Sequence, residues 1–213
     1  MTTKDELEKF RTPHELKTFF EDLMEKISTD DNAKKEYRIG KGIYKYIKNE
    51  LYPLVFFAIK HYNDNHLIRP IIGNQGYDGE IKIDEEIIDK IELTWAIDGK
   101  ESNEIAKDLN EKGHTEVSTL LDNRKQINKE RCLVNMRKKA LKDYSDSILV
   151  IVYDTDPTFL IDNSEDPKIL RELLDEAKTI LFKAKKVFLF FLPIELQSST
   201  GDKKFGPISL EIK

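Results

Sequence analysis

The sequence predicts an α/β fold: a mixed central β-sheet flanked by helices, with an N-terminal helical extension. Three observations carry this prediction. Apolar residues in the N-terminal third recur at helical spacing, and after Pro70 they alternate instead, which is the period of a strand. The run 148–153 is continuous and rich in β-branched residues, as in strands buried on both faces. We expect the extension to span residues 1–34 and the α/β core to span 35–213.

The N-terminal extension begins with a strong helix-start signal. Thr12 is placed as the N-cap, Pro13 as the first helical residue, and Glu15 as the partner in a capping box. The helical spacing stops at a polar loop, residues 28–33. A second helix is expected at 35–62. Its weak points are Gly40, Gly42 and Pro53.

Two alternating runs after Pro70 predict a β-hairpin, and Asp98-Gly99 is expected to end its second strand. One face is expected to carry the apolar residues at odd positions, namely Tyr77, Ile81, Ile83, Ile87, Ile91, Leu93 and Trp95. The later elements are expected as a helix from Ser102 to Glu111, an extended piece at 115–117, a helix at 123–144, a strand at 148–153, a helix at 166–184 and strands at 187–194 and 208–212.

The composition limits the class of protein. With 39% hydrophobic and 35% charged residues, the chain fits a single globular core with many helices. The single Cys132 excludes an internal disulfide and fits a reducing compartment. The start MTTKDELEKF lacks a signal-peptide core, and the runs 51–59 and 187–194 are too short to span a membrane. We therefore expect a cytoplasmic protein that does not associate with membranes. Its oligomeric state is not fixed, and a homodimer stays open.

The hairpin concentrates seven acidic residues in the fifteen positions from Asp78 to Glu92. If its turn is centred on Glu85, Asp78 lies opposite Glu92 on the face away from the isoleucines. Facing Cβ atoms are about 4.5–5.5 Å apart, so the two like charges need compensation. A hard cation, Mg²⁺ or Mn²⁺, is one solution. Solvation, helped by Lys82 and Lys90, is the other, and both stay open.

The spacing of Asp78 and the motif IELT at 91–94 resembles the PD-(D/E)XK nuclease superfamily, over about residues 43–153. The resemblance implies a restriction-endonuclease-like core that hydrolyses phosphodiester bonds, with DNA as the favoured partner. It implies that Asp78, Glu92 and the carbonyl of Leu93 hold Mg²⁺. It also implies a glutamate on the helix before the sheet, and Glu50 is the best match. Members of the superfamily often serve in restriction, repair or defence.

The sequence departs from this family at Thr94, where a lysine is usual. A hydroxyl cannot replace an ammonium group in stabilising the charge of the transition state. Some members supply the lysine from a neighbouring helix, and residues 124–142 carry eight basic residues against one acid. By resemblance Lys139 is the better match, and Lys138 borders the apolar sector of that helix. A solvated basic face is the alternative for either lysine.

The same basic helix is expected to bind nucleic-acid phosphates, with Arg131, Arg137 and Lys142 as its candidates. Arg137 falls inside the apolar sector drawn on a helical wheel, so we expect it to have a buried partner or to contact an anion. The net charge of −5 argues against indiscriminate coating of nucleic acid.

Other constellations have less support. The four histidines (His14, His61, His66 and His114) lack zinc-hydrolase spacing, and Cys132 is expected in the core. Gln75 and the pair Asp154 and Asp156 rank below the hairpin site. Three hypotheses follow: a Mg²⁺-dependent nuclease, a binding or regulatory protein of the same fold without catalysis, which Thr94 favours, and an α/β interaction protein whose acidic hairpin is plain surface.

Overall fold

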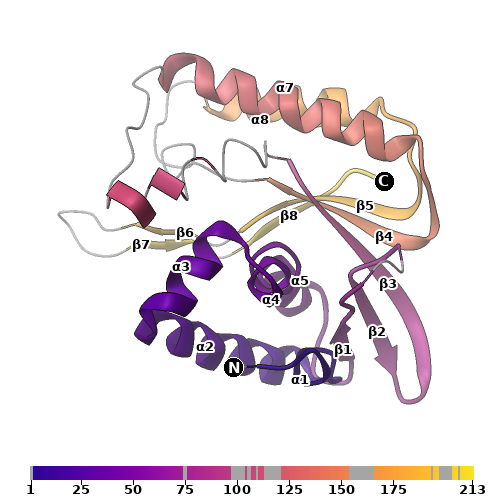
Figure 1. Cartoon of the computed structure of the whole chain (residues 1–213). Helices are drawn as coiled ribbons and strands as arrows, with labels where there is room; N and C mark the ends of the chain where they lie inside the picture. Colours follow the sequence, from indigo (N-terminus) through magenta and orange to yellow (C-terminus); the bar gives the residue numbers. More distant parts are fainter. Residues whose placement is uncertain are drawn as a thin grey trace. The chain divides into compact units, whose positions relative to one another are not determined.

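The computed structural model, drawn in Figure 1, divides into two compact units. Unit 1 consists of Met1–Leu93 and Asp98–Val117, and unit 2 of Thr94–Ile97 and Ser118–Lys213. The structure describes residues 2–73, 76–96, 104, 107–108, 110–112, 121–153, 166–192, 194–196, 203–205 and 207–213. Each unit is described by itself. The predicted division at residue 35 stays a prediction.

Unit 1 opens with helices whose starts follow the sequence signals. Thr12 caps α2 in the predicted capping box: its hydroxyl accepts from the Glu15 N–H, and the Glu15 carboxylate accepts from the Thr12 N–H. The predicted loop at 28–33 is wrong. Asp30 instead caps a further helix, because its carboxylate accepts from the Asn32 and Ala33 N–H groups. The first three helices are α1 (Lys4–Leu7), α2 (Pro13–Thr29) and α3 (Asp31–Ile39).

The single helix expected at 35–62 is broken at the positions named as weak. Gly40 and Gly42 have φ angles of 64° and 58°, which end α3 and allow a new start. Pro53 has no N–H to donate within the helix, and the turn before it is a π-helix. The segment therefore reads α4 (Ile43–Tyr46), η1 (Ile47–Leu51) and α5 (Tyr52–His61).

Three antiparallel strands follow: β1 (Leu67–Pro70), β2 (Gly79–Ile83) and β3 (Glu86–Trp95). The predicted register holds at the start of β2, where Gly79 pairs with Ile91 and Ile81 with Asp89. Farther along, Lys82 pairs with Ile87, so Ile88 is an extra residue in a β-bulge. The turn is therefore at Asp84 and Glu85 rather than centred on Glu85.

The bulge also changes which isoleucines face inward. Ile81, Ile91 and Leu93 are buried as predicted. Ile83 and Ile87 are 36% and 40% exposed, so their predicted place in the apolar layer is wrong. For Ile87 the reason is that one extra residue in β3 reverses the alternation and puts it on the face of Lys82. Ile83 keeps the face of Ile81 but lies next to the turn, at the exposed hairpin tip.

Of the helix expected from Ser102 to Glu111, the structure describes Glu104, Lys107, Asp108 and 110–112, which are helical. Asn110 joins this helix to α3, since its side chain accepts from the Arg38 guanidinium at 3.4 Å and donates to the Lys35 carbonyl at 3.2 Å. Ser102 and the extended piece at 115–117 lie outside the described residues.

Unit 2 contains the rest of the sheet and two long helices. Its elements are α7 (Leu121–Ala140), β4 (Asp143–Tyr153), α8 (Asp166–Lys178), β5 (Lys183–Phe191), β6 (Ile194–Leu196), β7 (Lys203–Phe205) and β8 (Ile208–Glu211). Strands β4 and β5 are parallel, and β8 is antiparallel to β5. Both helices end, and both parallel strands begin, several residues before the predicted positions.

Along the main sheet the strand order is β1-β2-β3-β4-β5-β8, with β6 and β7 forming a separate pair. The last residues of β3 belong to unit 2, where the Ala96 N–H donates to the Val152 carbonyl. The protein is therefore an α/β protein with a mixed six-stranded sheet, as the sequence predicted at that level.

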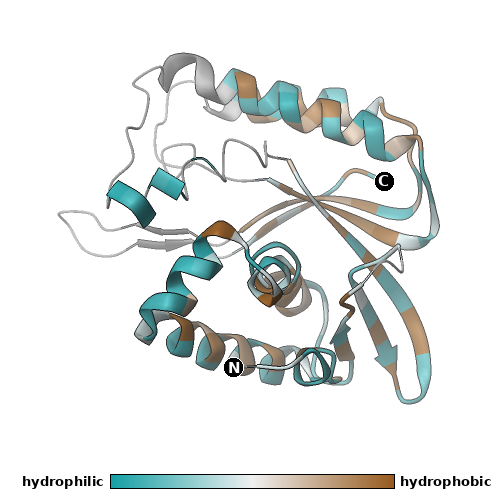
Figure 2. Ribbon diagram, in the orientation of Figure 1, coloured by the Kyte–Doolittle hydropathy of each residue, from teal (hydrophilic) through white to brown (hydrophobic). Residues whose placement is uncertain are grey.

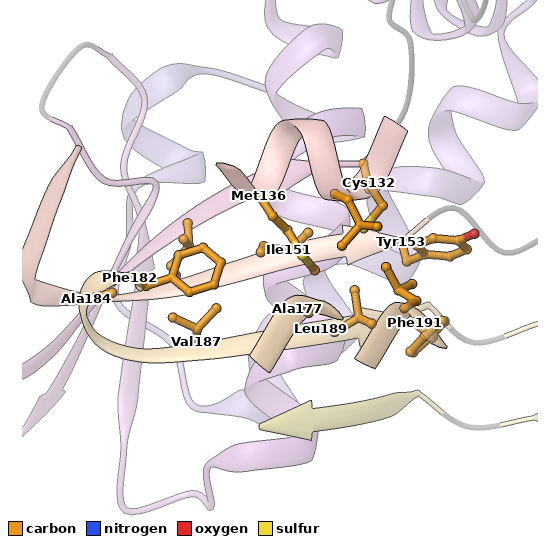
Figure 3. Close-up of a cluster of buried hydrophobic side chains, with 14 of the residues drawn as sticks. Cys132, Met136, Ile151, Tyr153, Ala177, Phe182, Ala184, Val187, Leu189 and Phe191 are labelled. Atoms are coloured by element: carbon orange, nitrogen blue, oxygen red, sulfur yellow. The ribbon is translucent and has the colours of Figure 1, made fainter. Parts of the chain in front are cut away.

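The core of unit 2 lies between its helices and strands (Figure 3). Cys132 and Met136 of α7 and Ala177 of α8 pack against one face of β4 and β5. Residues of both parities in β4 are buried, as predicted for a strand covered on both faces. Figure 2 shows the contrast between the apolar middle of these strands and the hydrophilic outer surface of the helices. Within the described residues, the helices are all too short or too polar to cross a membrane.

Candidate functional site

Asp78 is fixed where β1, β2 and β3 meet. Its carbonyl accepts from the Ile71 N–H at 2.9 Å, and its own N–H donates to the Ile91 carbonyl at 2.7 Å. Its carboxylate oxygen Oδ2 accepts from the Leu93 N–H at 2.7 Å. That N–H belongs to the peptide joining Glu92 to Leu93. The structure therefore brings the Asp78 carboxylate against the segment predicted to share a metal with it.

A helix packs against the strand beside Asp78. A Cβ atom added at Gly79 would lie 3.0 Å from both methyl carbons of Leu54, a tight contact that would require Leu54 to shift. Gly79 therefore lets α5 approach β2 closely. Glu50 precedes Leu54 by four residues and lies in η1. In this turn the Tyr52 N–H donates to the Ile47 carbonyl five residues back, a geometry often found at functional sites.

Glu50 has a strongly perturbed acidity. Burial, first, and then the charge of Asp78 raise the pKa of its carboxyl to about 8; Lys45 opposes the rise, and Glu92 adds to it. Because Asp78 and Glu92 both act on Glu50, the three predicted carboxylates lie within electrostatic range of one another inside unit 1. This cluster is called the acidic site below. Lys45 was not singled out from the sequence, because its position in the helix gives no sign of the contact.

A second network, beside the acidic site, holds a buried acid. Glu80 is 6% exposed; its carboxylate accepts from the Tyr77 hydroxyl at 2.7 Å and from Arg69 Nε at 3.1 Å. The hydrogen bond to Glu80, together with burial, raises the pKa of Tyr77. Glu80 lies two residues after Asp78, so the alternating pattern predicts the same face for both. That pattern alone could not show that Glu80 would be buried and paired.

The lysines considered as neutralising groups for the hairpin contact aromatic rings. Lys82 Nζ lies 4.5 Å from the centre of the Phe10 ring, and Lys90 Nζ lies 5.1 Å from that of Tyr77. Arg69 lies over the same Phe10 ring at 4.6 Å. The two contacts with Phe10 tie β1 and β2 to the N-terminal segment.

The donor chemistry of the acidic site suits a hard cation. Its groups are carboxylates, and the predicted additional ligand is a carbonyl, so all are oxygen donors of the kind that Mg²⁺ and Mn²⁺ prefer. In the part of the chain that the structure describes, no three His, Cys, Asp or Glu residues form a group that could hold a metal ion. Metal binding by Asp78, Glu92 and Leu93 is therefore a proposal that rests on chemistry and proximity.

The remaining predicted site residues lie in unit 2, at or near α7. Lys138 is exposed, Lys139 Nζ lies 5.7 Å from the centre of the Tyr144 ring, and Arg131 is half-buried. Lys142 follows the helix and is exposed. Their roles toward the acidic site and toward nucleic acid stay predictions.

The predicted place of Arg137 in the apolar sector of the helix is wrong, whereas the expected contact with an anion is present. Its side chain is 59% exposed, and Nη2 lies 3.6 Å from a carboxylate oxygen of Glu176. The predicted helix continues to Tyr144, and its apolar sector depends in part on Leu141 and Tyr144. Helix α7 ends at Ala140, so the predicted sector is misplaced. The buried stripe instead carries Cys132, Leu133 and Met136.

Helix α7 carries a buried lysine, Lys129, that the sequence did not single out. Lys129 Nζ lies 2.9 Å from carboxylates of both Glu172 and Glu176 on α8, and these hydrogen bonds raise the pKa of Lys129. The three side chains join the two helices. Burial raises the pKa of the Cys132 thiol to about 12, which fits its expected place in the core. Gln75, His114, Asp154 and Asp156 lie outside the described residues.

Comparison of the chain with protein-family models, with curated proteins and with solved structures finds no match. The class that the fold defines is thus an α/β protein with a mixed six-stranded sheet. The PD-(D/E)XK resemblance and the restriction-endonuclease-like core stay predictions.

Proposed function

We propose that this protein is a metal-dependent nuclease-like protein that hydrolyses phosphodiester bonds, with DNA as its favoured substrate. The observation that carries the proposal is the acidic site, in which Glu50, Asp78 and Glu92 come from a helix turn and two strands. Burial, first, and then repulsion by the charges of Asp78 and Glu92 raise the pKa of Glu50 to about 8.

A divalent cation relieves such repulsion, and acidic clusters in proteins often exist for this purpose. Asp78, Glu92 and the Leu93 carbonyl would hold Mg²⁺ or Mn²⁺. When bound, the ion would polarise a phosphate oxygen and lower the pKa of a bound water. The Leu93 N–H, donating to Asp78, holds that carboxylate in one orientation.

Glu50 is suited to a different task from the other two acids. With a pKa near neutrality, its carboxyl group can take up or release a proton at working pH, which is what general acid–base catalysis requires. We assign Glu50 to accepting the proton of the attacking water once a bound cation has lowered the pKa of its carboxyl and released its own proton. Asp78 and Glu92 are assigned to the metal.

The charge missing at Thr94 must come from elsewhere if the protein is an enzyme. The candidates are Lys139 and Lys138 on α7, in that order. Lys45 joins them, because its charge acts on Glu50 within unit 1. A lysine that serves the reaction lowers the rate strongly when changed to alanine, whereas a lysine of a solvated face does not.

The direct test is cleavage of single- and double-stranded DNA and RNA by the purified full chain, with Mg²⁺ or Mn²⁺. We expect metal-dependent cleavage of DNA, abolished in Asp78→Ala and Glu92→Ala. Glu86→Ala, which removes an exposed acid from the same hairpin, should cleave like the wild type. Cleavage that survives in Asp78→Ala would overturn the assignment of the site.

The second candidate function is a binding or regulatory protein of the same fold without catalysis. Thr94, in place of the motif lysine, is the observation that favours it. This candidate predicts that the protein binds metal and DNA and leaves all four nucleic-acid substrates intact. The Lys45, Lys138 and Lys139 variants would then change DNA affinity at most.

A further inference from the structure

One end of unit 2 carries two exposed leucines, each just before a strand. Asp143 pairs with Lys183 where the parallel strands β4 and β5 begin, and neighbouring strands are about 4.8 Å apart. Leu141 and Leu181 each precede that pair by two residues. They are 85% and 89% exposed, although Phe182, the next residue after Leu181, is buried. Neither leucine fills the core.

The surroundings of these leucines are basic. Helices α7 and α8 finish at this end, and the exposed lysines here are Lys138, Lys142, Lys178, Lys183 and Lys185. The exposed acids in the same segments are Asp143, Asp146 and, in the last turn of α8, Asp175. Lysines near helix C-termini complement the helix dipole, which accounts for some of them. The helix dipole does not explain why Leu141 and Leu181 are exposed at this end. Together these residues form a surface called the basic edge.

Unit 1 carries a surface of the opposite chemistry at the tip of the β2–β3 hairpin. All five residues from Ile83 to Ile87 are exposed, and between the two isoleucines lie Asp84, Glu85 and Glu86. The side chain of Glu85 is 98% exposed, and its carboxylate lies 3.7 Å from Lys82 Nζ. The bulge at Ile88 puts Ile83 and Ile87 on opposite faces of the tip. The tip therefore presents an apolar side chain to each side of an acidic end. We call it the acidic tip.

The two surfaces match in both charge and apolar character. We propose that the protein self-associates, with the acidic tip of one copy seated on the basic edge of a second copy. One isoleucine of the tip, Ile83 or Ile87, then packs on Leu141 and Leu181. The carboxylates of the tip face the lysines of the basic edge. This inference uses no residue of the acidic site, although its basic edge shares Lys138 and Lys142 with the residues considered for catalysis and for nucleic-acid binding.

The association should be weak and salt-sensitive. Each surface is small compared with the roughly 800 Å² per partner of a stable interface, so we expect a transient complex. Exposed charges are screened over about 10 Å at 0.1 M salt, so raising the salt concentration should dissociate the copies.

The experiment is sedimentation velocity of the full chain over a range of protein concentrations, at low and high salt. We expect reversible self-association at low salt. Leu141→Ser with Leu181→Ser should weaken it by about tenfold or more, because the apolar contact is lost. Val134→Ser, which changes a 45% exposed residue on α7, is the matched control and should associate like the wild type.

Charge reversal tests the pairing itself. Glu85→Lys with Glu86→Lys should abolish self-association, as should Lys142→Glu with Lys183→Glu. Mixing these two variants should restore a complex, because each then presents a surface complementary to the other. All substitutions are at exposed positions, and an unchanged melting temperature confirms folding.

Three results would overturn the proposal: a wild type that stays monomeric at every concentration, a leucine variant that associates normally, or a mixture that forms no complex. If the basic-edge reversal removes DNA binding and leaves self-association intact, the edge is a nucleic-acid surface instead. Asp78→Ala should associate normally, so failure of the metal site and failure of this inference give different results.

Discussion

The acidity of Glu50 predicts a distinctive dependence of stability on pH. Its folded-state pKa, about 8, lies above the ordinary value of 4.5, so between these two pH values the folded state keeps a proton that the unfolded state loses. The free energy of unfolding contributed by Glu50 therefore falls as pH rises from about 4.5 to about 8 and changes little outside this window. Glu50→Gln removes the titration and should remove the fall.

The magnitude follows from the pKa values. A pKa difference of one unit corresponds to about 1.4 kcal/mol, so the upper limit of the effect is about 5 kcal/mol. Glu50 is half-buried, and solvent screening reduces the effect, so we expect about 2 kcal/mol. Relative to wild type, Glu50→Gln should gain this stability between pH 5 and pH 8.

Urea denaturation of both proteins at pH 5, 6.5 and 8 measures this difference. Because the other titrating groups are the same in both proteins, subtraction isolates Glu50. Glu86→Gln, at an exposed acid of the hairpin, is the control and should show no pH-dependent difference. A difference between Glu50→Gln and wild type that stays constant from pH 5 to pH 8 would refute the reasoning.

Three further predictions follow from the contacts around the acidic site. Gly79→Ala should destabilise the protein by about 1–3 kcal/mol in urea denaturation, because the new methyl meets Leu54, and adding Leu54→Ala should relieve that clash; additive losses would argue against it. Glu80→Ala should cost about 3 kcal/mol, since it leaves two donors without their buried acceptor; a loss below 0.5 kcal/mol would contradict the network. Lys45→Ala should raise the pKa of Glu50, so the midpoint of the NMR titration of its carboxyl carbon should move to higher pH; an unchanged midpoint would exclude the contact.

Local signals in the sequence predicted local structure well. The capping box at Thr12 depends on residues within one turn, and the register of Gly79 with Ile91 depends on alternation, so both could be read from the sequence. The β-bulge at Ile88 could not be read from the sequence, because no residue type in this strand marks where an extra residue is inserted. For that reason the sequence predicts the wrong face for Ile87, whereas Ile83 is exposed because it lies beside the turn.

The site was predicted in part for the same physical reasons. The Asp78 and Glu92 pair followed from strand pairing, whereas Glu50 came only from the family resemblance, since tertiary packing of η1 brings it there. Arg137 was placed on the wrong side of α7 because the helix was drawn too long. The burial of Glu80 depends on Arg69, a residue on another strand, which no local pattern reports.

The central claim is that the acidic site binds a divalent cation. It is tested most directly by titrating Mg²⁺, and separately Mn²⁺, into the full chain in a calorimeter at pH 7, in two buffers with different ionisation enthalpies. The account predicts binding accompanied by proton release, because a cation beside Glu50 lowers the pKa of a carboxyl that is largely protonated at that pH. Binding should disappear in Asp78→Ala. No heat from either ion with the wild type, or equal binding by Asp78→Ala, would contradict the claim.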